Sequence, residues 1–281
     1  MYDASMRLHR SEGGRDAGWL LRALVLAGVV AAAPCARAEE PALPPGLEPG
    51  GVARVATALD GDTLILADGR TVRLVGVEAP KPPLDAAPAR RWPLAEAAHS
   101  ALAELAAERM IALGFGGRRT DRYGRLLAHL YLEDGLWLQG ELLSRGMARV
   151  LTAPDNRALA KEMLARESEA RAARRGIWAS ELYAVRAPSE ARHHLESFEI
   201  VEGTVAAVTR VSTHTDLALG IAGGDGLTVA LLPESRRLFK ASGLDPEGFV
   251  GRQLRVRGWL RWWKGPRLEV SHPEQIELLP P

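Results

Sequence analysis

Three short segments of the N-terminal half carry carboxylates, and two of them also carry arginines. The segments are Asp60-Gly61-Asp62-Thr63, Val72–Pro80 and Thr120–Arg125. The acidic residues Asp62 and Glu78 stand near the ends of strand-like runs, where their side chains can converge. Because a hard cation such as Ca²⁺ is bound by carboxylate and carbonyl oxygens, this pattern is compatible with a metal site. Taken singly, Arg73 and Arg125 are equally compatible with salt bridges at strand ends.

The elements around these segments follow a regular order. Alternation of apolar and polar residues predicts strands at Val52–Ala58, Thr63–Ala67, Thr71–Val77, Met110–Phe115 and Leu126–Leu132. Apolar spacing and glycine stops predict helices at about Pro93–Arg109, Leu136–Arg145 and Asn156–Arg175. Five strands with a helix between the third and fourth are what a five-stranded OB-type barrel requires, so we expect an α+β, mainly β fold with three helices.

Residues from about Val52 to Trp178 resemble the staphylococcal-nuclease-like (thermonuclease) family. The resemblance rests on the three segments, in order and spacing, and on the ending Gly176-Ile177-Trp178. It implies Ca²⁺-assisted hydrolysis of nucleic-acid phosphodiester bonds. The implied metal ligands are Asp62, Glu78 and the backbone oxygen of Ala79, with Asp60 orienting the ligands from behind them. The implied catalytic phosphate-binding residues are Arg73 and Arg125, and the implied nucleic-acid contacts are Arg122 and Tyr123.

One position departs from the family in a way that bears on the chemistry. The family carries a Glu that positions or activates water after Ala-Pro or Thr-Pro, and here that position is Lys81. A cation beside the metal should weaken Ca²⁺ binding, and a lysine acts as a base only if its pKa falls by several units. Asp85 in the following loop is a candidate replacement, although a loop carboxylate is more often solvated. Thr152 stands where the family often has a nucleotide-contacting tyrosine, and His99 is expected to be a surface or partly packed residue.

The C-terminal part is also rich in strands and predicts a second, smaller OB-like barrel over 198–281. Between Arg252 and Arg267 there are six basic residues and no acidic one. Alternation places one set of side chains on a common face, namely Arg255, Arg257, Trp259, Arg261 and Trp263. Such a strip suits single-stranded nucleic acid, with phosphates on arginine and bases on tryptophan. The alternative is that the tryptophans cover the barrel mouth beneath arginine stems.

The N-terminal segment predicts export. Arginines precede the apolar run Ala23–Ala33, and Ala36-Arg37-Ala38 offers a cleavage site, so we interpret residues 1–38 as a signal peptide, with an uncleaved anchor as the alternative. Cleavage would remove Cys35, the only cysteine, which excludes disulfides and thiolate sites from the mature chain. The whole chain has 36 basic and 35 acidic residues; removing the five arginines and three acidic residues of 1–38 leaves 31 and 32, a net charge of −1. Attraction to nucleic acid must therefore come from local clusters.

The predicted organisation has five parts. They are a signal peptide (1–38), a Pro/Gly-rich tether (39–51), a nuclease-like OB domain (52–180), a linker (181–197) and an OB-like domain (198–281). We expect a secreted or periplasmic, monomeric phosphodiesterase that acts on DNA or RNA, is impaired by Lys81 and, after signal cleavage, has no membrane partner. The alternatives are an inactive nucleic-acid-binding protein with the same fold and a purely structural envelope module.

Overall fold

The computed structural model describes residues 42–81, 94–220 and 226–280. The predicted signal peptide, Cys35 and Asp85 lie outside these ranges. Residues 39–281 form one compact unit by their contacts. Within the described ranges, no helix is both long and apolar enough to pass through a membrane.

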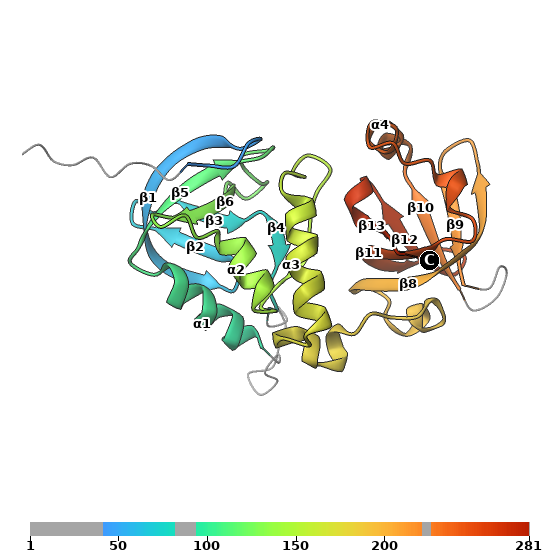
Figure 1. Cartoon of the computed structure of the whole chain (residues 1–281), viewed down its shortest axis with the longest axis horizontal. Coiled ribbons are helices and arrows are strands. Elements are labelled where there is room, and N and C mark those ends of the chain that lie inside the picture. The colour runs from blue at the N-terminus through green and yellow to red at the C-terminus, as the bar shows by residue number, and fades with distance from the viewer. Residues whose placement is uncertain (1–41, 82–93, 221–225, 281) are drawn as a thin grey trace, which may run out of the picture. The chain divides into compact units, whose positions relative to one another are not determined.

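The first barrel confirms the predicted OB-type architecture. Its strands are β1 (Glu48–Asp60), β2 (Thr63–Leu66), β3 (Thr71–Leu74), β5 (Met110–Phe115) and β6 (Leu126–Leu132), and they close in the order β1-β2-β3-β6-β5 (Figure 1). Strands β3 and β6 run parallel, while the other neighbours are antiparallel. Helix α1 (Ala95–Ala106) lies between the third and fourth barrel strands and packs Ala98 and Leu102 into the core. The predicted tether is partly structured, because β1 begins at Glu48 and pairs with β5.

The turn between β1 and β2 is held by a side chain and by close packing. The Oδ1 atom of Asp60 accepts the backbone N–H of Asp62 at 2.9 Å. A Cβ at Gly61 would lie 2.7 Å from the Cβ atoms of both Ala79 and Ala98, so only glycine lets this turn approach its neighbours. The two aspartates are therefore presented at a fixed position where β2 begins.

The predicted strand Thr71–Val77 is divided in the structure. Gly76 has φ +82°, a left-handed conformation that turns the chain out of β3 and into β4 (Gly76–Glu78). Strand β4 pairs with β7 (Arg149–Leu151), a short strand that the pattern did not predict. Helices α2 (Leu138–Ser144) and α3 (Ala160–Ala172) complete this half of the chain.

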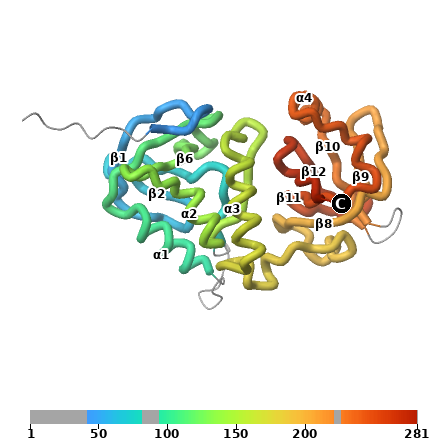
Figure 2. Tube along the Cα trace, viewed as in Figure 1, coloured from blue at the N-terminus to red at the C-terminus, as the bar shows by residue number. Residues whose placement is uncertain are grey.

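The second barrel repeats the same strand order. Strands β8 (Phe198–Arg210), β9 (Thr215–Leu219), β10 (Leu227–Leu231), β11 (Gln253–Trp262) and β12 (Pro266–Val270) close in the order β8-β9-β10-β12-β11, and β13 (Ile276–Leu278) adds to β11. Strands β10 and β12 are parallel, and α4 (Arg236–Ala241) lies between the third and fourth strands, as in the first barrel. Figure 2 follows this path in orange and red. The predicted second OB-like barrel is confirmed.

A buried ion pair joins the two barrels. Arg257 on β11 donates two hydrogen bonds of 2.9 Å to the two carboxylate oxygens of Glu167 on α3. Their side chains are 1% and 0% exposed. Glu167 also accepts the backbone N–H of Val150 at 2.6 Å and a hydrogen bond from Arg171 at 2.8 Å. Burial opposes the charged form of Glu167, but the attraction and hydrogen bonds of Arg257, the N–H of Val150 and the charge of Arg171 together outweigh it, so the pKa of Glu167 is lowered.

We expect Glu167→Gln to destabilise the protein strongly, because Arg257 would stay buried and lose its bidentate partner, with Glu277 as its one remaining carboxylate among the described residues. Removing one member of a buried pair costs about 3–5 kcal/mol. The free energy of unfolding, measured by urea denaturation, checks this. The control is Glu247→Gln, which breaks the exposed pair Arg210–Glu247, whose side chains are 64% and 58% exposed, and should cost at most about 1 kcal/mol. Equal losses in the two variants would contradict a fixed junction between the barrels.

Candidate nucleic-acid cleavage site

Asp62 is the centre of the polar cluster at the start of β2. Its side chain is 0% exposed, so its charge must be compensated inside the protein. Its Oδ2 accepts the backbone N–H of Ala79 at 2.9 Å. Its Oδ1 accepts hydrogen bonds from Arg73, from Lys81 at 2.8 Å and from the Thr63 hydroxyl at 3.1 Å. Both oxygens of Asp62 are therefore in use.

Lys81 supplies the cation between the two aspartates. Its Nζ lies 2.8 Å from Oδ2 of Asp60 and 2.8 Å from Oδ1 of Asp62. Burial, followed by repulsion from Arg73, lowers the pKa of Lys81, and the hydrogen bond to Asp60 opposes this shift. The side chain that replaces the family Glu is thus an integral part of the cluster.

Glu78 is directed to a partner that the sequence analysis missed. Its Oε2 accepts hydrogen bonds from Nε and Nη2 of Arg149, at 3.1 Å and 2.9 Å. The pairing of β4 with β7 places these two residues directly opposite each other. Arg149 also donates to the carbonyl oxygen of Phe198 at 2.7 Å. No motif marks Arg149 in the sequence, because its role depends on the unpredicted strand β7.

The predicted calcium ligands do not fit Ca²⁺ in this arrangement. Ca²⁺ takes about six to eight oxygen ligands at roughly 2.3–2.6 Å. Here the ammonium of Lys81 already bridges Asp60 and Asp62, and Glu78 is paired with Arg149. In the part of the chain that the structure describes, no group of three or more His, Cys, Asp or Glu side chains has a geometry suited to a metal ion. We therefore derive no chemical step through calcium.

The two predicted catalytic arginines lie close enough to interact electrostatically. Arg73 on β3 is paired with Leu127 on the parallel strand β6, and Arg125 is the residue directly before β6. Arg73 donates to the Val77 carbonyl oxygen at 3.1 Å and is held by Asp62. Burial lowers the pKa of Arg73, and Arg125 adds to this effect by repulsion. A guanidinium whose usual pKa is above about 12 nevertheless stays charged.

Asp121 fixes the second arginine. Its Oδ2 accepts Nε of Arg125 at 2.7 Å, and its Oδ1 accepts the backbone N–H groups of Tyr123 and Arg125 at 2.8 Å and 3.0 Å. Arg122 lies over the Tyr123 ring, which is 68% exposed, with its guanidinium carbon 4.8 Å from the ring centre. Arg122 and Tyr123 thus form an exposed corner beside the fixed Arg125.

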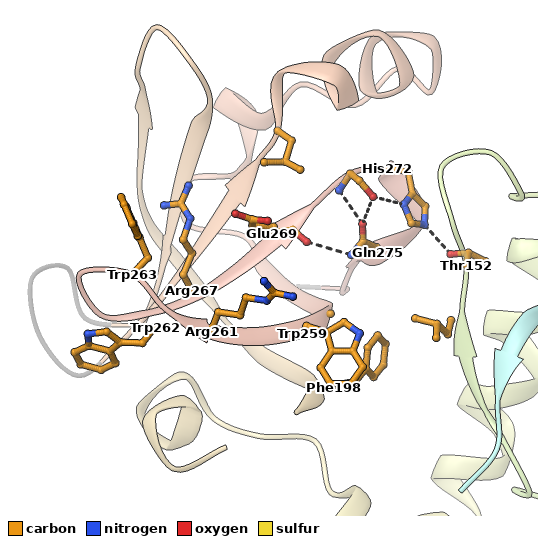
Figure 3. A pocket seen from close by; sticks show the side chains of 14 residues that line it. Thr152, Phe198, Trp259, Arg261, Trp262, Trp263, Arg267, Glu269, His272 and Gln275 are labelled. Atoms are coloured by element: carbon orange, nitrogen blue, oxygen red, sulfur yellow. Dashed lines mark hydrogen bonds between the residues drawn. The ribbon is translucent and has the colours of Figure 1, made fainter. Parts of the chain in front are cut away.

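Two further residues named from the sequence have packing roles. His99 is exposed, and its Nε2 atom lies 3.1 Å from the carbonyl oxygen of Ala58. Thr152, at the family's tyrosine position, is hydrogen-bonded to Nε2 of His272 at 2.7 Å (Figure 3). Burial, aided by repulsion from Arg157, lowers the pKa of His272 to about 4, so the ring is neutral at pH 7.

The predicted C-terminal strip needs correction at two positions. Arg257 is buried against Glu167 and cannot reach a nucleic acid. Arg255 is 16% exposed and paired with Glu202 and Glu277 on the strands that flank β11. The predicted alternation is right for both arginines, but the outer face of this part of β11 is covered by acidic side chains. The residue pattern of one β-strand does not show which side chains of other elements pack over it.

The tryptophan side chains at the C-terminal end of β11 are exposed to solvent. Trp259 and Trp263 are 49% and 67% exposed. Trp262, which strand alternation places on the face opposite to Trp259 and Trp263, is nevertheless 60% exposed, because Trp262–Pro266 is the last pair of the β11–β12 ladder and the barrel core ends before it. Arg261 is exposed and makes no side-chain ion pair or hydrogen bond within the described residues.

We expect Lys81→Glu to create calcium affinity by turning the bridging cation into a third carboxylate. A change of two charges next to a divalent ion is worth several kcal/mol at an effective dielectric constant of about 20, so Ca²⁺ should bind at least about 100-fold more tightly than to the wild type. Isothermal titration calorimetry measures the affinity. Lys240→Glu, an equal charge change on α4, is the control and should leave it unchanged. Strong Ca²⁺ binding by the wild type would contradict the role given to Lys81.

The chain is similar in sequence to known nuclease-like proteins. Residues 71–180 match the family model described as staphylococcal nuclease homologue. A protein of Escherichia coli O157:H7 called "Uncharacterized endonuclease" is 30% identical over 128 residues, which cover 44% of this chain and 75% of that protein. Endonuclease YncB of Bacillus subtilis (strain 168) is 35% identical over 133 residues, 45% of this chain and 61% of that protein. The chain belongs to the staphylococcal nuclease homologue family.

Proposed function

We propose that the chain hydrolyses phosphodiester bonds of nucleic acid at the mouth of the first barrel. The observation that carries this proposal is the pair Arg73 and Arg125, which interact electrostatically and are held by Asp62 and Asp121 respectively. A guanidinium fork matches two phosphate oxygens, and two such forks fixed in advance suit the charge that develops as the phosphorus is attacked. The relatives named as endonucleases support the same substrate class.

The chain's own residues account for binding and charge stabilisation but leave water activation weak. Lys81 occupies the position of the family Glu, and its ammonium is engaged by Asp60 and Asp62. A cation that donates to two carboxylates does not accept a proton from water. We therefore propose that hydrolysis is slow.

Calcium dependence is the further implication of the family. In the family's arrangement Asp62 and Glu78 would hold Ca²⁺, which would supply positive charge to the phosphate. Because Lys81 fills the place between the aspartates and Glu78 is paired with Arg149, we propose that calcium binds weakly here and that Lys81 provides part of the positive charge instead.

The same observation favours a second function, binding without turnover. The phosphate-binding arginines are retained, whereas the water-activating carboxylate is replaced by a residue integrated in the cluster. A protein with these features would hold nucleic acid at the first barrel and cut it negligibly. Cleavage by the purified protein decides between the two functions.

We also propose that the protein is exported and acts as a monomer outside the cytoplasm. The support is the sequence of residues 1–38, with its arginines, apolar run and small-residue cleavage site. N-terminal sequencing of the mature protein should begin at Glu39, and an intact Met1 in the exported fraction would indicate the anchor instead.

We expect Arg73→Lys to reduce cleavage of a labelled oligonucleotide by about 10²–10³-fold, since it keeps a charge but loses the fork that faces the phosphate. Rates of product formation under single-turnover conditions measure this. Arg70→Lys, on the exposed β2–β3 hairpin and paired with Asp68, is the control and should cut at the wild-type rate. Equal rates for the two variants would remove Arg73 from the site.

We expect Lys81→Glu to raise the rate in the presence of Ca²⁺, because it restores a carboxylate at the water-activating position. General-base contributions of about 10²–10⁴-fold set the scale. Initial rates with Ca²⁺ and with a chelator separate the metal effect from the base effect. A fast wild type that is slowed by Lys81→Glu would show that Lys81 promotes the reaction directly.

A further inference from the structure

A cavity of about 720 Å³ opens at the end of the second barrel. Figure 3 shows Trp259, Arg261, Trp262 and Trp263 around it, with Phe198 beside Trp259. The rings of Phe198 and Trp259 meet edge to face, with centres 6.4 Å apart. Three exposed indoles in one cavity are unusual for a surface with no ligand, because large apolar side chains are normally buried.

A second cavity, of about 530 Å³, leads to the cleavage site. Its wall at one end is formed by Glu78, Ala79, Pro80 and Lys81. Its lining also includes Phe198 and Trp259, the same two rings that line the first cavity. The two hollows therefore share one aromatic pair, and their linings together include Trp263 and Lys81.

Side chains with little solvent exposure hold Phe198 and Trp259 in position relative to Glu78. Arg149, paired with Glu78 at the cleavage site, donates to the carbonyl oxygen of Phe198 and lies over its ring, 4.4 Å from the ring centre. The buried pair Glu167–Arg257 fixes β11, the strand that carries Trp259. The position of Trp259 relative to Glu78 thus depends on packed side chains.

The chemistry of the cavity walls selects a single strand. Indole rings stack on base faces, and in a duplex those faces are covered by neighbouring base pairs. Arg261, which has no side-chain partner within the described residues, and Lys264 at the hairpin supply positive charge for the backbone. Glu269 also lines this cavity, so the charge is concentrated at its arginine side.

We propose that a single-stranded nucleic acid binds along both cavities, stacks on Trp263, Trp262 and Trp259, and enters the cleavage site past Phe198. The second barrel thereby makes the enzyme selective for single strands. The entry of the nucleic acid into a cleavage site depends on the proposed function. Its binding along the two cavities does not.

Fluorescence anisotropy tests the proposal with the full mature chain in EDTA, where binding is measured without cleavage. The probes are fluorescein-labelled thymidine oligonucleotides of about 6 and about 20 nucleotides, within and beyond the site size of one OB fold. Trp259→Ala and Trp263→Ala should each weaken binding of the longer probe by about 5- to 150-fold. Val250→Ala, at an exposed apolar residue outside both cavities, should not.

Two matched pairs of variants distinguish binding along the two cavities from nonspecific attraction to positive charge. Arg261→Gln should reduce the salt dependence of binding by about one ion, whereas Arg252→Gln, an equal change outside both cavities, should not. Leu182 lines only the second cavity, so Leu182→Glu should weaken the longer probe and spare the shorter one, with Val250→Glu as control.

The outcomes distinguish this inference from the proposed function. If the protein cuts neither oligonucleotides nor bis(p-nitrophenyl) phosphate but shows the expected binding losses, the proposed function falls and the single-strand site stands. If it cuts, Trp259→Ala should raise KM for the oligonucleotide more than it changes KM for the small diester. Wild-type affinity in folded Trp259→Ala and Trp263→Ala, or duplex DNA that competes as well as single strands, would overturn the inference.

Discussion

A carboxylate with no solvent exposure, Asp62, sets the conditions for the cleavage site. An isolated buried charge costs several kcal/mol, so the protein must surround it with donors. Those donors come from four places in the sequence: Thr63, Arg73, the backbone of Ala79, and Lys81. The same contacts orient Arg73 and occupy the place of a metal ion. The orientation of Arg73 and the position of the Lys81 ammonium between the two aspartates therefore have one origin.

The second structural constraint is the junction between two barrels of the same topology. In each barrel the third and fifth strands are parallel, and a helix precedes the fourth strand. Glu167 and Arg257 link the barrels through a buried ion pair. Burying the two ions costs free energy of desolvation, and removing one of them would leave the other charge buried without that partner. Through Val150, Glu167 also supports β7, which carries Arg149 and so holds Glu78. The cleavage site thus depends on contacts made by the second barrel.

The fold was predictable because its signals are local. Alternation and glycine turns place β5 and β6 at the predicted residues, and the helix between the third and fourth strands indicates the barrel topology. The break at Gly76 and the strand β7 were missed, because a three-residue strand has too little pattern to be seen. Both features depend on the pairing of β4 with β7, which lie about seventy residues apart in the sequence.

The site was predictable as a set of residue types but not as a set of contacts. The sequence places Asp60, Asp62 and Lys81 in one region, and the hydrogen bonds show that lysine bridges the aspartates. In β11 the alternation was right, yet Arg257 is buried because the partner surface comes from α3, ninety residues earlier. The charged residues of one β-strand do not show which charged residues of another element pack against them.

The most direct test of the central claim is a crystal structure of the mature protein grown with Ca²⁺ and a dinucleotide. The account predicts a phosphate contacted by Arg73 and Arg125, with Nζ of Lys81 still between Asp60 and Asp62 and no calcium there. Calcium coordinated by Asp62 and Glu78, with Lys81 turned away and Arg149 released, would contradict it.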